Sequence, residues 1–188
     1  MTAVKKILTI VGITIASLAY SQGGTMIVNN YTPYEYRGAL IANNFSGGCY
    51  PIIGTDAGVI IPPDSHTGNG NALIYTNYRD QYTTSLYPMP NWTVSLAANS
   101  NSIRPWNHGS LIPGGTLSNN TKWSASKFEM YDPATSAYVP GFNTTVSLAG
   151  NSCYMAPDYF VTPSGANSAE IFTITTSTGL VETYLQIY

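Results

Sequence analysis

Few side chains in this sequence could transfer protons or bind a metal ion. It contains two histidines, His66 and His108, and nine acidic residues. Asp64 and His66 are two positions apart, which places both side chains on one face of an extended segment and would suit an acid–base pair or part of a metal site. The sequence does not determine whether the segments of His66 and His108 meet. We therefore expect both histidines in surface turns, with no metal and no cofactor.

Nucleophiles and paired acids give no clearer sign of catalysis. The Gly-x-Ser-x-Gly motif of a serine hydrolase is absent. A glycosidase needs two carboxyl groups facing each other across a groove. Glu129 and Glu182 are the best candidates, because both fall in predicted strands. A secreted hydrolase is therefore kept as an alternative, while the absence of catalysis is favoured and no catalytic residue is assigned.

Aromatic residues carry the strongest positive signal. The chain has 15 tyrosines and three tryptophans. An aromatic ring offers a flat apolar face, and the tyrosine hydroxyl adds a polar group, a combination that both sugars and protein partners use. We expect the tryptophans to be largely buried and at least a third of the tyrosines to be exposed. The predicted ligand-binding residues come from two polar, aromatic segments and are Tyr78, Arg79, Asp80, Tyr82, Trp106 and His108.

The N-terminus has the three parts of a bacterial-type signal peptide. Lys5 and Lys6 precede an apolar run over 7–18, and Ala19-Tyr20-Ser21 provides small residues at a cleavage site. A membrane-spanning helix needs about 20 apolar residues, so this run is too short for membrane insertion. We predict a cleaved helical signal peptide over 1–21 and a mature chain over 22–188. The mature protein is expected to be secreted or at the cell surface, with the periplasm also possible.

The mature chain carries little charge. Without Lys5 and Lys6, five basic residues face nine acidic ones, a net charge of −4. No basic face can form, which argues against nucleic acid as a partner. Charged residues make up 9% of the whole chain, against roughly 25% in typical domains. The predicted surface is therefore neutral and rich in hydrogen-bonding groups, which suits glycans, proteins or further copies of the chain.

The two cysteines indicate one disulfide. Cys49 and Cys153 are the only cysteines in the sequence. In the oxidising compartment that a signal peptide implies, a pair far apart in sequence most simply forms one bond. Two buried free thiols are the alternative.

Short runs of β-forming residues, separated by Gly, Pro and Asn, extend through the mature chain. They predict a single all-β domain, a two-sheet sandwich of jelly-roll or immunoglobulin-like kind with about ten short strands. The last two strands should form a hairpin around Thr178-Gly179, with aliphatic residues inward and tyrosines outward. Residues 99–120 should form a long loop. The predicted strands are 25–30, 36–42, 58–61, 72–78, 91–97, 122–131, 144–148, 152–156, 169–176 and 180–188.

These observations favour a secreted, non-catalytic binding or adhesion domain whose partner is a glycan or a surface protein. A self-assembling subunit of an extracellular fibre or surface layer is the main alternative, because low charge reduces repulsion between copies and strand edges can pair. The sequence identifies neither the ligand nor the oligomeric state.

Overall fold

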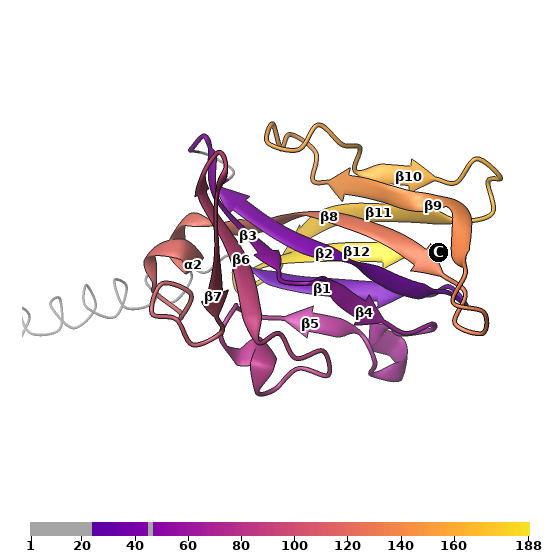
Figure 1. The fold of residues 1–188 in the computed structure, drawn as a ribbon, viewed down its shortest axis with the longest axis horizontal. Helices are drawn as coiled ribbons and strands as arrows, with labels where there is room; N and C mark the ends of the chain where they lie inside the picture. The colour runs from indigo at the N-terminus through magenta and orange to yellow at the C-terminus, as the bar shows by residue number, and fades with distance from the viewer. Residues whose placement is uncertain (1–23, 45–46) are drawn as a thin grey trace, which may run out of the picture.

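The computed structural model describes residues 24–44 and 47–188. The predicted signal peptide over 1–21 lies outside the described residues. The rest forms two packed β-sheets, so the prediction of an all-β sandwich is confirmed (Figure 1). No helix among the described residues is long and apolar enough to cross a membrane.

The first sheet has the strand order β10-β11-β12-β1-β5. Its strands are β1 (Thr25–Asn30), β5 (Leu73–Tyr75), β10 (Tyr159–Val161), β11 (Ser168–Thr175) and β12 (Val181–Ile187). Strand β1 runs parallel to β12 and antiparallel to β5, so the first and last described strands lie side by side. The predicted hairpin is confirmed as β11 and β12, with Leu185 and Ile187 buried and Tyr188 exposed.

The second sheet has seven strands. Six follow the order β7-β6-β3-β2-β8-β9, and β4 pairs with β2. The strands are β2 (Glu35–Asn44), β3 (Cys49–Thr55), β4 (Val59–Ile61), β6 (Asn91–Ala97), β7 (Ser100–Pro105), β8 (Lys122–Tyr131) and β9 (Tyr138–Ser147). Short helical turns, η1 (Thr67–Asn69), η2 (Asp80–Tyr82) and α2 (Thr116–Asn120), lie in the connections.

An aromatic cluster occupies the core between the sheets. Trp92 and Trp123 are almost wholly buried, with ring centroids 6.0 Å apart. Tyr78 packs 5.2 Å from both indole rings, and the Trp92 indole N–H donates to the Tyr78 carbonyl oxygen at 2.9 Å. The expectation that the tryptophans are largely buried is met for these two, while Trp106 is half-buried. Among the described residues five tyrosines are exposed, which equals a third of the 15 in the sequence.

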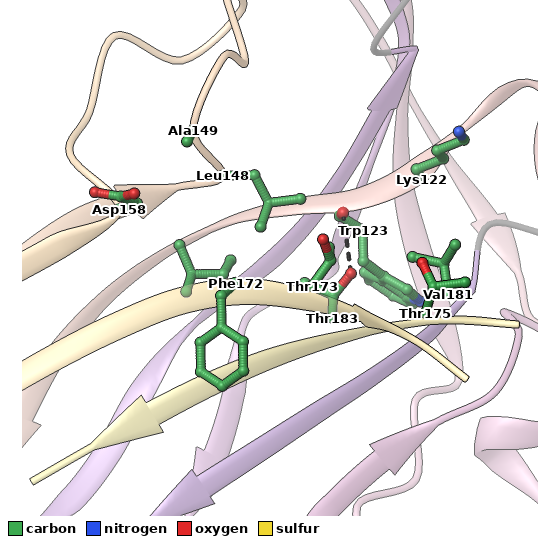
Figure 2. A pocket seen from close by; sticks show the side chains of 11 residues that line it. Lys122, Trp123, Leu148, Ala149, Asp158, Phe172, Thr173, Thr175, Val181 and Thr183 are labelled. Atoms are coloured by element: carbon green, nitrogen blue, oxygen red, sulfur yellow. Dashed lines mark hydrogen bonds between the residues drawn. The ribbon is translucent and has the colours of Figure 1, made fainter. Parts of the chain in front are cut away.

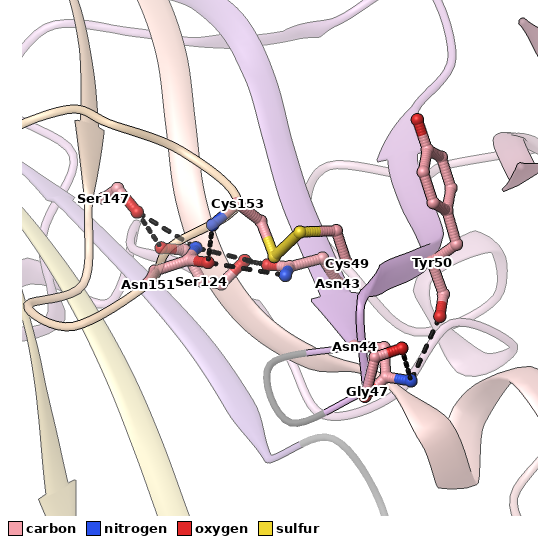
Figure 3. Close-up of a disulfide and its surroundings, with 9 residues drawn as sticks. All are labelled: Asn43, Asn44, Gly47, Cys49, Tyr50, Ser124, Ser147, Asn151 and Cys153. Carbon is pink, nitrogen blue, oxygen red and sulfur yellow. Dashed lines mark hydrogen bonds between the residues drawn. A yellow bond between two sulfur atoms is a disulfide. The ribbon is translucent and has the colours of Figure 1, made fainter. Parts of the chain in front are cut away.

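The predicted disulfide is present between Cys49 and Cys153, with their Cα atoms 5.3 Å apart. It ties β3 to the loop after β9, and it is the chemistry of an oxidising compartment. A buried polar network lies beside it (Figure 3). Asn151 donates to Ser147 Oγ at 3.0 Å and accepts from the Cys153 main-chain N–H at 3.1 Å. The network also includes Asn43, which accepts from Ser124 and Asn151.

Three strands were not predicted, and one predicted strand is wrong. Strands β3 and β10 are interrupted or bounded by Pro and Gly, which hide the alternation of apolar and polar residues. Strand β7 is a polar, exposed edge strand without an apolar side. Strand β7 and the short helix α2 also correct the prediction that residues 99–120 form one loop. Residues 152–156 are not a strand, because the disulfide and the Asn151 network hold this segment in turns.

Candidate functional site

Two of the predicted ligand-binding residues form an aromatic pair at the surface. The rings of Tyr82 and Trp106 stack with centroids 5.4 Å apart and planes inclined by 20°. Tyr82 is 47% exposed and Trp106 is half-buried. Tyr82 ends the short helix η2. Trp106 directly follows β7, and its main-chain N–H donates to the Pro90 carbonyl at 2.9 Å. We name Tyr82 and Trp106 the aromatic platform.

Tyr78 does not belong to this surface. Its side chain is 2% exposed, and its hydroxyl is hydrogen-bonded to Thr121 at 2.8 Å. Burial raises the pKa of the Tyr78 phenol well above its ordinary value. The predicted contact between Tyr78 and a ligand is therefore incompatible with this structure. Its ring packs against Trp92 and Trp123 instead, and its carbonyl accepts from the Trp92 indole N–H, so Tyr78 belongs to the core.

A charged pair lies close before Tyr82 in the chain, separated from it by Gln81. Arg79 Nε and Asp80 Oδ1 are 2.7 Å apart, and both side chains are partly exposed. The hydrogen bond from Arg79 holds the pKa of the Asp80 carboxyl below its ordinary value. The pair is uncharged as a unit and presents guanidinium donors and carboxylate acceptors, the groups that bind hydroxyl-bearing ligands.

Local hydrogen bonds hold this segment in place. The side-chain oxygen of Asn77 accepts from the main-chain N–H groups of Arg79 and Asp80, at 2.9 Å each. Gln81 is buried and donates back to the Asn77 carbonyl. A short turn fixed by its own side chains is a rigid support for a binding surface.

His108 is exposed and belongs to a separate hydrogen-bonded group. Its Nδ1 accepts from the Ser110 main-chain N–H at 3.2 Å and lies 2.8 Å from Ser110 Oγ. Arg104 in turn donates to Ser110 Oγ at 2.6 Å. Because Nδ1 is the acceptor, the neutral ring carries its proton on Nε2. His108 follows Trp106 closely in sequence, but among the described residues no hydrogen bond or ring contact joins its side chain to the aromatic platform.

His66 has different partners from His108. Its Nε2 lies 3.2 Å from Asp64 Oδ1, so the predicted Asp64–His66 pair does form. Its Nδ1 accepts from the Gly68 main-chain N–H at 3.1 Å, and its ring stacks on Tyr31. Both ring nitrogens are occupied by these contacts. Across residues 24–44 and 47–188, no three His, Cys, Asp or Glu side chains are grouped as a metal site would require.

The two candidate acids of a hydrolase do not face each other. Glu129 lies on β8 of the seven-stranded sheet and Glu182 on β12 of the five-stranded sheet. Each is bound instead by a nearby phenol, from Tyr131 at 2.8 Å and from Tyr184 at 2.7 Å. Both alternate with buried residues on their strands and point away from the core, so the two carboxylates lie on opposite outer faces of the sandwich.

The structure also contains a cleft that sequence reasoning missed. It measures about 530 Å³ and lies between β11 and β12 on one side and the start of β8 with the loop after β9 on the other (Figure 2). Its lining includes Trp123, Thr173, Thr175 and Thr183. No local pattern could have revealed it, because the lining comes from four separate segments.

Comparison with known proteins does not assign the chain to a family. No family model, no curated protein and no solved structure matches it.

Proposed function

We propose that this protein is a secreted, non-catalytic binding or adhesion domain, and that the aromatic platform with the Arg79–Asp80 pair binds a glycan. The observation that carries the proposal is the stacked, partly exposed Tyr82–Trp106 pair, with the accessible polar groups of Arg79 and Asp80 two to three residues before Tyr82 in the chain. Sugar rings have flat faces of C–H groups bordered by hydroxyls. Such a ring stacks on an aromatic face while a neighbouring guanidinium and carboxylate bind its hydroxyls.

Three further features support this proposal. The platform is held by a short turn with internal hydrogen bonds, so little conformational entropy is lost on binding. The low charge of the chain limits non-specific attraction to polyelectrolytes. The disulfide is typical of proteins that work in an oxidising compartment, where surface and matrix glycans are found.

The test uses the mature protein and four soluble probes: cellohexaose, chitohexaose, maltohexaose and xylohexaose. Binding is measured by titration calorimetry and by the fluorescence of the partly exposed Trp106. We expect one probe class to bind and Trp106→Ala to weaken its affinity at least tenfold. That loss equals about 1.4 kcal/mol, which is of the size expected for one aromatic contact. Tyr82→Ala should have a similar effect.

Tyr159→Ala provides the matched control. Tyr159 is 54% exposed on β10, outside the platform, so its removal should change affinity less than twofold. Binding that survives Trp106→Ala, or that falls equally in Tyr159→Ala, contradicts the proposed site. If none of the four probes binds but Trp106→Ala abolishes adherence to whole cells, the platform binds a surface protein instead.

A second candidate function is self-assembly through strand β7. This strand is the outer strand of its sheet, is exposed along most of its length and carries one charged residue, Arg104. Ile103 on this strand is 64% exposed. An edge with so little charge is open to pairing with another copy. Ile103→Lys should keep the protein monomeric at concentrations where the wild type forms oligomers in light scattering, and a wild type that is monomeric throughout removes this candidate.

A further inference from the structure

The second half of β11 has a free edge. Strand β10 pairs with β11 only at residues 168–170, and the main-chain carbonyl of Asp158 adds one hydrogen bond, accepting from the Ile171 N–H at 2.8 Å. Before that point the chain turns away, because the Pro157 carbonyl accepts from Ser147 at the end of β9 at 2.9 Å. No strand therefore lies beside residues 172–175 on the side opposite β12 among the described residues.

The alternation of hydrogen bonds shows which main-chain groups face this free edge. The main chain of Ser168 exchanges two hydrogen bonds with that of Tyr188, which directly follows β12. At the other end of the hairpin, the Thr176 N–H donates to the Leu180 carbonyl. Even-numbered residues of β11 thus bond to β12, and odd-numbered residues point to the other side. The bond from Ile171 to Asp158 agrees with this. The N–H and C=O groups of Thr173 and Thr175 face the free edge and have no hydrogen-bond partner among the described residues.

The side chains at the same positions line the cleft. Along β11, Ala169 and Ile171 face the other sheet and are buried, as core residues should be. Thr173 and Thr175 continue the same inward-facing series but are exposed, because the two sheets separate there. Polar residues replace aliphatic ones where the sandwich opens. Figure 2 shows the cleft beside this half of β11, with Asp158 and Lys122 toward its two ends.

We propose that this cleft binds an extended peptide segment of a partner protein, which adds a strand to the free edge of β11. The unpaired groups of Thr173 and Thr175 are two residues apart, a spacing of roughly 6.7 Å that matches the repeat of an extended strand. Main-chain hydrogen bonds supply the affinity in this mode of binding, and alternate side chains enter pockets. The floor of Trp123 and Ile171, with threonine hydroxyls beside it, suits uncharged Val, Thr or Ile side chains.

The test is a titration of the ¹⁵N-labelled mature protein with the neutral probe acetyl-Val-Thr-Val-Thr-Val-amide. We expect the amide resonances of Thr173 and Thr175 to shift and their hydrogen exchange to slow at least tenfold. Two further probes carry N-methyl groups on the odd or on the even residues, which removes donors while keeping the side chains. At least one of them should lose binding tenfold or more.

Two matched variants test the cleft itself. Ala149→Trp places a large ring at the exposed rim of the cleft and should weaken binding at least tenfold, whereas Ala98→Trp, at an exposed position on the β6–β7 turn, should change it less than twofold. Thermal unfolding verifies that both variants fold. The proposal is overturned if Thr173 and Thr175 do not shift at millimolar peptide, or if both N-methylated probes bind as well as the parent. Shifts that appear with protein concentration alone would assign the edge to a second copy instead.

Discussion

Removal of the disulfide should have a large and calculable effect on stability. The bond joins residues 104 positions apart. Closing a loop of that length removes chain entropy from the unfolded state equivalent to about 4.7 kcal/mol at 25 °C. A domain of this size is stable by about 5–15 kcal/mol in total. If the wild-type stability is at the low end of this range, the double variant Cys49→Ala, Cys153→Ala should fold only marginally. At the high end, it should retain about two thirds of the wild-type free energy of unfolding.

Chemical unfolding in urea, followed by the fluorescence of the buried Trp92 and Trp123, measures this effect. The midpoint should fall, and the dependence of unfolding free energy on urea should steepen, because an unfolded chain without the cross-link exposes more surface. Wild-type protein unfolded with and without a reducing agent is the control, since it breaks the same bond without truncating a side chain. A loss below about 1.5 kcal/mol in both experiments would refute the chain-entropy account.

The same perturbation should loosen one side of the cleft. Cys153 lies in the loop that follows β9, and Leu148 and Ala149 from that loop line the cleft. Once the bond is broken, Asn151 and its partners must hold the loop alone. Hydrogen exchange of the Asn151 amide, which donates to the Leu148 carbonyl at 3.0 Å, should accelerate more than that of amides in β6. Equal acceleration in both would mean that the loss of stability is global only.

Three further predictions concern the core. Burial raises the pKa of Tyr36 and Tyr78 above the value near 10 that the two phenols have in the unfolded chain. The stability that they contribute is therefore complete below pH 10 and falls above it, by about 1.4 kcal/mol per pH unit for each phenol. Absorbance at alkaline pH should show both phenols ionising only as circular dichroism reports unfolding. Asn43→Ala should cost about 1–3 kcal/mol in urea unfolding because it leaves buried partners unpaired, whereas the exposed Asn143→Ala should be nearly neutral. Gly38→Ala should destabilise the fold by about 1–3 kcal/mol and lower its melting temperature, since the added Cβ would lie 2.5 Å from the backbone of β8. A variant with the wild-type melting temperature would contradict this close packing.

Local sequence determined the class of fold and several of its parts. Period-two alternation and turn residues predicted the sandwich, and the bounds of β1, β6 and β8 agree with the structure. Strand β6 and the second half of β8 have one buried and one outward side, which is the condition under which alternation is visible, whereas β1 is buried at every position after Thr25 and is a short apolar run that ends in two asparagines. The cysteine count predicted the disulfide for a comparable reason, because two cysteines in an oxidising compartment have one possible partner each.

The site depended on contacts that no local pattern encodes. The sequence placed Tyr78 and Tyr82 in one polar, aromatic segment, and only the fold turned Tyr78 into the core and Tyr82 outward onto Trp106. The free edge of β11 likewise arises where β10 stops and the preceding chain leaves the sheet. Composition and alternation are properties of neighbouring residues. Which side chains meet across a surface, and which strand edge is left unpaired, is decided by how distant segments pack.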